Sequence, residues 1–118
     1  MNIEQFNADW LKAWSEKDVE RLVRFYTDDC DYKDPQVPAG LKGRAALHAY
    51  LTGLFAATPP IRYNPDETWA INGGFCGRWF ADIGEHGEMG RMRGFDLVIM
   101  RGDEIALNEV FVHTLPAA

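Results

Sequence analysis

In the stretch RMRGFDLVIM, residues 91–100, a lone carboxylate, Asp96, interrupts otherwise apolar residues and is the residue best suited to acid–base chemistry. If the stretch is a β-strand, its side chains alternate between two faces, so Asp96 shares a face with apolar groups. An apolar pocket there would desolvate the carboxylate and raise its pKa toward values useful for proton transfer. The alternative is a structural role, in which Asp96 only hydrogen-bonds a neighbouring side chain. The residues expected on its face are Met92, Gly94, Val98 and Met100.

The last apolar stretch of the chain contains an amide that could assist this carboxylate. Asn108 is expected on one face with Ala106, Val110 and Val112. From there it would partner Asp96 across paired strands, and an amide can orient a carbonyl or a water without changing its own charge. The alternative is a polar pair on the surface of the sheet.

The opposite face of that last stretch is expected to carry Glu109, Phe111 and His113. We interpret Glu109 and His113 as surface or interface groups rather than catalysts. The assignment depends on strand register, because one β-bulge would exchange the two faces. The sequence therefore leaves open whether Asn108 or Glu109 faces the pocket.

An aromatic side chain, Trp79, is the strongest candidate for a flat pocket wall. Strand alternation groups it with Phe75, Gly77 and Ala81, which combine a ring surface with a gap left by small residues. Such a wall would admit a ring-shaped ligand. The alternative is that Trp79 fills the core beneath the tryptophans of the first helix. Trp79 can have both roles, because the pocket of a small domain is an unfilled part of its core.

Three amphipathic helices are predicted to precede the strands that position these residues. The first begins with a capping box at Asn2 and runs to about Ser15. Asp18 caps a short second helix, whose apolar face includes Tyr26. A third helix begins at Arg44 and is stopped by the Thr-Pro-Pro sequence that follows it.

The remainder of the chain is expected to be extended. Residues 30–35 predict a brief edge strand and residues 36–43 a loop. After the third helix, glycine-rich turns separate four extended stretches. Helices followed by a meander indicate one α+β domain spanning residues 1–118, with the helices packed on an antiparallel sheet. The four stretches are 61–71, 75–83, 91–101 and 104–115.

Composition limits the classes of partner. A chain of 118 residues with 47% apolar residues suits one domain with a core of its own. The 18 acidic residues exceed the 12 basic ones and give a net charge of −6, which disfavours nucleic acid and anionic membranes as partners. Because the sequence shows no membrane-spanning stretch and no signal peptide pattern, we expect a cytoplasmic protein.

Neither the cysteines nor the histidines indicate a metal site. Cys30 and Cys76 stand alone and are expected to be structural thiols. The three histidines, His48, His86 and His113, lack the spacing of metal ligands and fall in different predicted elements. We therefore expect no metal and no cofactor.

Five phrases occur in a characteristic order along nearly the whole chain: FYTDDCDYKDP, GRAALHAYL, FCGRWFADI, RGFDLVIM and GDEIALNEVFVHTL. Together they resemble the nuclear-transport-factor-2-like superfamily and, within it, the SnoaL-like, polyketide cyclase-like branch. The resemblance implies a cone in which three N-terminal helices pack on a curved antiparallel sheet and enclose a pocket. Members of that superfamily include enzymes, binding modules and dimerisation domains, so the fold alone does not specify a reaction.

The resemblance also suggests roles for single residues. It places an acid–base aspartate at Asp96 and one rim of the cone at Tyr26, Tyr32 and Asp34. A tyrosine hydroxyl there could polarise a substrate carbonyl, and Asp34 could act as a base, as carboxylates near this rim do in the related ketosteroid isomerases. The proline after Asp34 is also a turn signal, and we favour the turn.

The expected catalytic pair is therefore Asp96 and Asn108, and His48 is expected on the flank of its helix. The pocket is expected to hold a small apolar or aromatic ligand. The residues expected to line it are Trp14, Tyr26, Tyr32, Trp79, Met92, Val98 and Val110.

Three functions compete. The first is a cofactor-independent cyclase or isomerase, in which Asp96 takes a proton next to a carbonyl and Asn108 or a tyrosine steadies the enolate. The second is a non-catalytic module that binds a hydrophobic ligand or dimerises. The third, a scaffold for protein partners, would need a large exposed apolar patch. Epoxide hydrolysis of the limonene-epoxide-hydrolase type is disfavoured, because Trp79, Ala81 and Val110 stand where its charged residues would be.

The outward face of the predicted sheet is too apolar to be left in contact with water. We therefore expect a homodimer with twofold symmetry, packed through this face. The residues expected on it are Phe95, Leu97, Ile99, Leu107 and Phe111.

Overall fold

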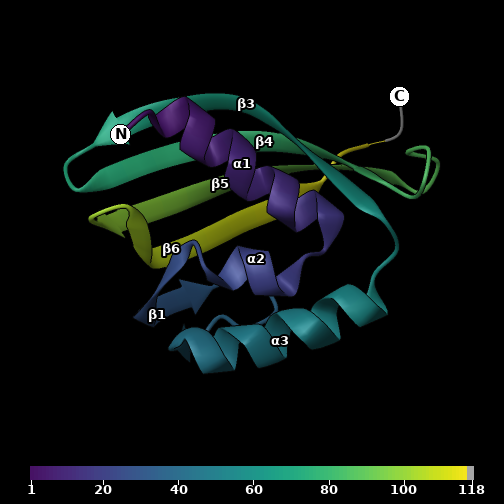
Figure 1. The fold of residues 1–118 in the computed structure, drawn as a ribbon. Helices are drawn as coiled ribbons and strands as arrows, with labels where there is room; N and C mark the ends of the chain where they lie inside the picture. The colour runs from purple at the N-terminus through teal and green to yellow at the C-terminus, as the bar shows by residue number, and fades with distance from the viewer. Residues whose placement is uncertain (117–118) are drawn as a thin grey trace.

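Three helices pack on a curved six-stranded sheet in the computed structural model, which describes residues 1–116 (Figure 1). The helices are α1 (Ile3–Glu16), α2 (Val19–Val23) and α3 (Arg44–Ala57). The strands are β1 (Tyr26–Lys33), β2 (Leu41–Lys42), β3 (Ile61–Ile71), β4 (Gly74–Ile83), β5 (Gly90–Arg101) and β6 (Glu104–Thr114). Their order across the sheet is β2-β1-β6-β5-β4-β3. The expected α+β class is confirmed, and residues 117–118 of the predicted domain lie outside the described residues.

The helices begin at the predicted caps. Asn2 Oδ1 accepts a hydrogen bond from the backbone N–H of Gln5 at 3.0 Å, and Asp18 Oδ1 accepts one from that of Arg21 at 3.1 Å. These bonds satisfy amides that the first turn of a helix leaves unpaired. α1 ends at Lys17, whose φ of 55° lies in the left-handed region and turns the chain directly into α2.

The passage into the sheet differs from the prediction. Tyr26, expected on the second helix, is the first residue of β1, because α2 ends at Val23 and the Phe25 carbonyl accepts a hydrogen bond from Ile105 N–H in β6 at 2.8 Å. β1 lies between β2 and β6 rather than at the edge, and it runs parallel to β6. The prediction of an antiparallel sheet was therefore wrong for this pair of strands, and the edge strand on this side of the sheet is β2, within the segment expected to be a loop.

A bulge changes the register of β6. Pairing with β5 passes from Leu107 directly to Ile105, which leaves Ala106 out of the ladder. Ile105 is fully buried, whereas Ala106, expected on the inner face, is only half-buried. The bulge lies before Asn108, so Asn108 keeps the inward orientation that alternation predicts and is 0% exposed.

The core lies between α1, α3 and the inner face of the sheet. α1 packs on β3, while α3 packs on β1 and α2 (Figure 1). Alternate residues of β4 and β5 point into this layer as predicted. The largest apolar side chains that are less than 2% exposed are Trp10, Tyr26, Tyr32, Phe75, Leu22, Leu47, Leu51 and Ile105.

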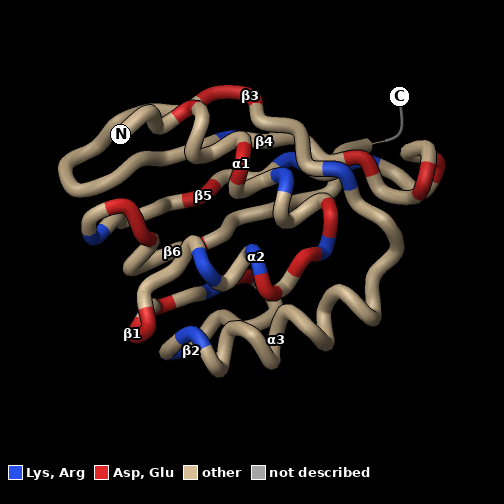
Figure 2. The backbone as a smooth tube through the Cα atoms, viewed as in Figure 1, with Lys and Arg blue, Asp and Glu red and all other residues tan. Residues whose placement is uncertain are grey.

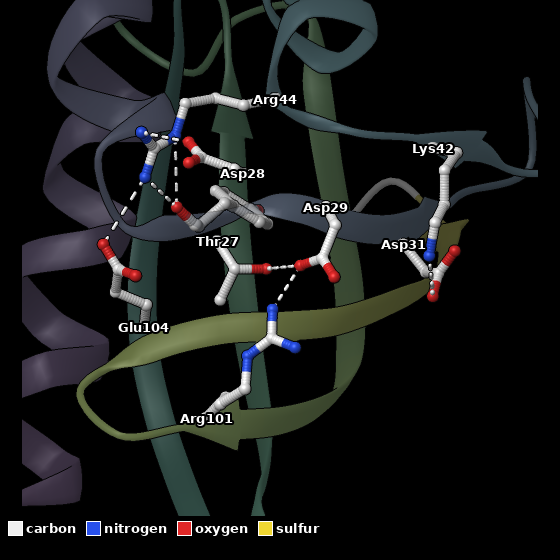
Figure 3. A network of polar contacts seen from close by, with 9 residues as sticks. Thr27, Asp28, Asp29, Asp31, Lys42, Arg44, Arg101 and Glu104 are labelled. Carbon is white, nitrogen blue, oxygen red and sulfur yellow. Dashed lines mark hydrogen bonds and ion pairs between the residues drawn. The ribbon is translucent and has the colours of Figure 1, made fainter.

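Ion pairs attach the start of β1 to its neighbours (Figure 3). The Arg44 guanidinium donates to the backbone oxygen of Tyr26, with its Nε at 3.2 Å, and also pairs with Glu104 at 3.4 Å. Beside this group, Asp29 pairs with Arg101 of β5. α3, β1 and the β5–β6 hairpin are thus tied together by side chains from three separate segments.

Charge is distributed unevenly over the backbone (Figure 2). Acidic residues occur on β1, β3 and the turns at the ends of the sheet, whereas α3 carries no Lys, Arg, Asp or Glu after its first residue, Arg44. None of the helices among residues 1–116 is both long and apolar enough to cross a membrane.

Candidate functional site

A cavity of about 210 Å³ opens between the helices and the inner face of the sheet. Its wall combines residues of α1, α3, β1, β3, β4, β5 and β6. Most of these residues are aromatic or aliphatic, and two carboxylates, Asp34 and Asp96, interrupt them. An apolar cavity with a few convergent polar groups is the usual form of a small-molecule site.

Asp96 reaches the cavity from the middle of β5 and is 3% exposed. Its Oδ2 accepts a hydrogen bond from Trp79 Nε1 at 2.7 Å, and its Oδ1 accepts one from Asn108 Nδ2 at 3.1 Å. Burial raises the pKa of Asp96 to about 7, because desolvation outweighs the two hydrogen bonds that favour the ionised form. The carboxyl group is thus placed to exchange protons near neutral pH.

A buried chain of hydrogen bonds fixes the Asn108 amide. The indole N–H of Trp10 can only donate, and it lies 3.3 Å from the Tyr26 hydroxyl. That hydroxyl therefore donates onward to Asn108 Oδ1, at 2.9 Å. The amide nitrogen must then face Asp96, so the arrangement around Asp96 is set by residues of α1, β1 and β6.

Both protein partners of Asp96 are hydrogen-bond donors. Because Asp96 also lines the cavity, a protonated carboxyl group can donate to a ligand there. The ionised group likewise keeps lone pairs for a proton from that side. This geometry allows Asp96 to take a proton from a ligand and to return one.

The structure separates the expected pocket residues into two groups. Trp14, Tyr32, Trp79, Met92 and Val110 line the cavity. Tyr26 and Val98, expected on its wall, are 0% exposed and lie in the core instead. Alternation assigns a residue to a face but does not say how deep it lies on that face. Asn108 also lies behind the wall, where it contacts Asp96 rather than the cavity.

Asp34 combines the turn that we favoured with a place on the cavity wall. Its Oδ1 accepts hydrogen bonds from the backbone N–H groups of Gln36 and Val37, at 2.8 and 3.2 Å. Its Oδ2 accepts hydrogen bonds from the hydroxyls of Tyr32 and Tyr50, both at 2.7 Å. The same carboxylate therefore closes the turn after β1 and orients two phenols beside the cavity.

Several cavity residues were not singled out from the sequence, and two of them are Tyr63 and Lys17. Tyr63 of β3 lines the cavity, and its ring contacts that of Trp79 edge to face, with the centroids 4.9 Å apart. Its hydroxyl makes no hydrogen bond to any of residues 1–116. Burial, followed by the charges of Asp96 and Asp34, raises the pKa of Tyr63, so it remains a donor at neutral pH. Lys17 is the second of these residues. The feature that sets it apart is its left-handed backbone conformation, with a φ of 55°.

The remaining candidates lie away from the cavity. His48 Nε2 is 2.5 Å from Glu20 Oε1, on the flank of α3. On the outer face of the sheet, Arg93 Nε donates to His113 Nε2 at 3.1 Å, beside Phe111, which is 53% exposed. Glu109 lies on that outer side as well, half-buried. Among residues 1–116, no group of three or more His, Cys, Asp or Glu side chains could hold a metal ion.

The chain is similar to several solved structures. A hypothetical protein with a ketosteroid isomerase-like fold from Catenulispora acidiphila, solved with trimethylamine, is 15% identical, with a TM-score of 0.74 over 89% of this chain and 82% of that one. SalBIII is an epoxide hydrolase/cyclase-like enzyme with a role in pyran ring formation in the polyether salinomycin. It is 18% identical, with a TM-score of 0.74 over 95% of each chain. An NTF2-like protein of unknown function from Burkholderia xenovorans is 15% identical, with a TM-score of 0.72 over 98% of this chain and 86% of that one.

These likenesses show that the fold is NTF2-like. None of the curated proteins matches the chain in sequence. The family model of the SnoaL-like domain matches residues 8–108, which include Asp34, Trp79, Asp96 and Asn108. The family and superfamily that the five sequence phrases indicated are thereby confirmed, and the chain belongs to the SnoaL-like domain family.

Proposed function

We propose that this protein is a cofactor-independent cyclase or isomerase that acts on an apolar ligand with a carbonyl group, with Asp96 as the acid–base residue. One observation carries the proposal. Asp96 faces a largely apolar cavity with a pKa of about 7, and both of its protein partners are donors. A general base is most effective when its pKa lies near the working pH.

In this mechanism the ionised Asp96 removes a proton from the carbon next to the ligand carbonyl. The electron pair of that C–H bond moves into the enolate, whose oxygen accepts a hydrogen bond from the Tyr63 hydroxyl. Protonated Asp96 then returns the proton to another carbon, which completes an isomerisation. In a cyclisation the enolate carbon instead bonds to a second carbonyl, whose oxygen takes the proton from Asp96. Asn108 positions Asp96 rather than touching the ligand.

Tyr63 fits the role of donor better than the other cavity tyrosines. Tyr32 and Tyr50 both donate to Asp34, whereas the Tyr63 hydroxyl makes no hydrogen bond to any other described residue. Its ring contacts Trp79, which in turn donates to Asp96, so base and donor lie on neighbouring parts of the wall. SalBIII, which shares the fold, has a role in pyran ring formation, and this supports ring-forming chemistry on a fold of this kind.

Proton exchange tests the proposal without knowledge of the natural substrate. The purified protein is incubated in D₂O with a panel of apolar and polyketide-like ketones, and deuterium uptake next to the carbonyl is followed by NMR. The wild-type rate should rise with pH and level off above about 7, because the base must be ionised. Asp96→Asn should lose about 10²–10⁴-fold, and Tyr63→Phe roughly 10²–10³-fold.

Asp66→Asn is the matched control, because Asp66 is exposed and pairs with Arg78 at 2.7 Å on the outer side of the sheet. It should exchange at the wild-type rate. Full exchange by Asp96→Asn would refute the role of Asp96. If no ketone exchanges, the alternative function, a non-catalytic module that binds a hydrophobic ligand, would be favoured.

That second reading is a non-catalytic module for a hydrophobic ligand. It is favoured by the two protein donors that already satisfy Asp96, since buried polar groups are usually paired for structural reasons. The two readings differ in the titration of Asp96 in the free protein. Carboxyl-resolved NMR, assigned with Asp96→Asn, should give a pKa near 7 for the enzyme, and a value near 4 would support the structural role.

A further inference from the structure

A continuous row of five aromatic rings runs along the cavity. Neighbouring rings in the row have centroids 4.9 to 6.4 Å apart, and each ring comes from a different element: α3, β1, α1, β3 and β4. All five residues line the cavity. In order, they are Tyr50, Tyr32, Trp14, Tyr63 and Trp79.

Each end of this aromatic row hydrogen-bonds a carboxylate. Trp79 donates to Asp96 at one end, and Tyr32 and Tyr50 donate to Asp34 at the other. Donation from a phenol or indole to an anion makes the ring more electron-rich. The faces of these rings are therefore better partners for a cation than ordinary aromatic side chains are.

The charge of Asp34 is not paired with a cation of the protein. No Lys, Arg or His of residues 1–116 lies within ion-pairing distance of its oxygens, and its four partners are two phenols and two backbone amides. Lys17 is the one basic residue among the described residues of the cavity wall. Its ammonium donates to the backbone oxygens of Phe55 and Thr58 and to Thr58 Oγ1, at 2.6 to 3.1 Å, and so compensates the negative end of α3.

The hydrogen bonds of Asp34 also restrict which cation would fit. A carboxylate has about four acceptor positions, and all four on Asp34 are taken. A primary ammonium would lose hydration on entering without gaining an acceptor. A methylated ammonium has little or no need of acceptors, and its charge would still be attracted by the Asp34 carboxylate and by the ring faces.

We propose that the cavity binds a small molecule with a tertiary or quaternary ammonium group, placed against Tyr32, Tyr50 and Trp14 next to Asp34. The apolar, carbonyl-bearing part of the ligand extends from there toward Asp96, so this proposal adds a charged group to the substrate class of the site proposed above. It depends on the same cavity but not on catalysis. The net charge of −6 adds a general attraction for cations.

A pair of ligands of nearly the same shape tests the charge directly. Choline and 3,3-dimethylbutan-1-ol differ in that a carbon atom replaces the charged nitrogen. Binding is measured by calorimetry and by shifts of the Trp14 and Trp79 indole N–H signals. We expect choline to bind at least tenfold more tightly than the alcohol. Equal affinities, or no choline binding at millimolar concentrations, would overturn the proposal.

Asp34→Asn tests the source of the preference. The new amide oxygen can still accept from Gln36 and Val37, and the two tyrosine hydroxyls can rotate to accept from the amide nitrogen. The fold should therefore be kept, and the preference for choline should fall several-fold, because only the attraction of the ring faces remains. Retention of the full preference would overturn the proposal. Asp66→Asn, which removes an equal charge outside the cavity, should leave the preference unchanged.

Tyr50→Phe gives a second test that does not remove the charge. It frees one acceptor position on Asp34 Oδ2. Ethanolamine, which carries a primary ammonium, should then bind several-fold more tightly than to the wild type, whereas choline, which loses the more electron-rich Tyr50 ring and needs no acceptor, should gain no affinity. No gain for ethanolamine would contradict the acceptor argument. Because binding is read without turnover and Asp96→Asn should keep the preference, failure of this proposal and failure of the proposed catalysis are distinguishable.

Discussion

Trp79 and Gly94 face each other across β4 and β5, and the indole lies against the glycine so closely that no side chain fits between them. A Cβ at position 94 would lie 2.0 Å from the Trp79 ring. The missing side chain therefore creates the space in which the indole lies with its N–H directed at Asp96. Gly94 thus positions Asp96 through Trp79.

Gly94→Ala should displace the Trp79 ring. We expect a loss of about 1–3 kcal/mol in the free energy of unfolding, as for other overpacked sites. We also expect a further rise in the pKa of Asp96, because a donor to its ionised form is lost. Denaturant unfolding and NMR titration measure the two effects.

The control is Gly53→Ala in α3, where a Cβ meets nothing within 4 Å. Gly53→Ala should raise the free energy of unfolding by roughly 0.5–1 kcal/mol. An unmoved Trp79 indole signal in Gly94→Ala would contradict the argument.

Asp96 should make folding stability depend on pH. Its pKa is raised from 3.8 to about 7 on folding. The folded protein therefore binds the proton more tightly, and the contribution of Asp96 is fully present below about pH 4 and lost as pH rises through about 7. The difference in unfolding free energy between wild type and Asp96→Asn should fall by about 1.4 kcal/mol per pH unit across that window.

Urea titrations at several pH values measure this difference, and it should be constant above pH 7 to 8. The exposed Asp103 of the β5–β6 turn provides the control. The same subtraction with Asp103→Asn should give no such slope. A difference between wild type and Asp96→Asn that does not change from pH 5 to 7 would show that Asp96 is not a desolvated carboxyl group.

Tyr26→Phe should release the Asn108 amide. The substitution leaves Trp10 Nε1 without an acceptor and Asn108 Oδ1 without a donor, both in the core. We expect a loss of about 1–3 kcal/mol of stability, together with a higher pKa for Asp96, since the amide can then turn its oxygen toward it. Tyr50→Phe is the comparison at a half-buried position, with an expected loss of about 0.5–1 kcal/mol. If Asp96 titrates as in the wild type, the amide is held by other contacts.

We propose a twofold dimer through the outer face of the sheet. Phe95 and Phe111 are paired neighbours there and are 38% and 53% exposed, and the Trp69 ring lies 5.9 Å from that of Phe95. Light scattering should give twice the 13.4 kDa of one chain. Phe111→Glu should yield monomers, because a charge would be buried in the interface. Met89→Glu, at an exposed residue of the β4–β5 connection, should remain dimeric. A monomeric wild type at micromolar concentration would refute the dimer.

Local patterns were sufficient where a single element determines the outcome. The inward orientation of Asp96 and Trp79 follows from the two-residue period of a strand, which needs no knowledge of neighbouring strands. Helix starts at Asn2 and Asp18 follow from side chains that cap their own first turn. Asn108 faces inward as alternation predicts only because the bulge in β6 lies before it, at Ala106.

The sequence by itself determined the starts of the first two helices, the long strands and the identity of the buried carboxylate, because each depends on residues close together in the chain. It indicated the family through five short phrases in a fixed order. Only the tertiary structure decided which groups meet around the cavity. Tyr26 and Asn108 are 82 positions apart, and the five rings of the aromatic row come from five elements. The parallel pairing of β1 with β6 brings such distant residues together, and contacts of this kind leave no periodic trace in the sequence.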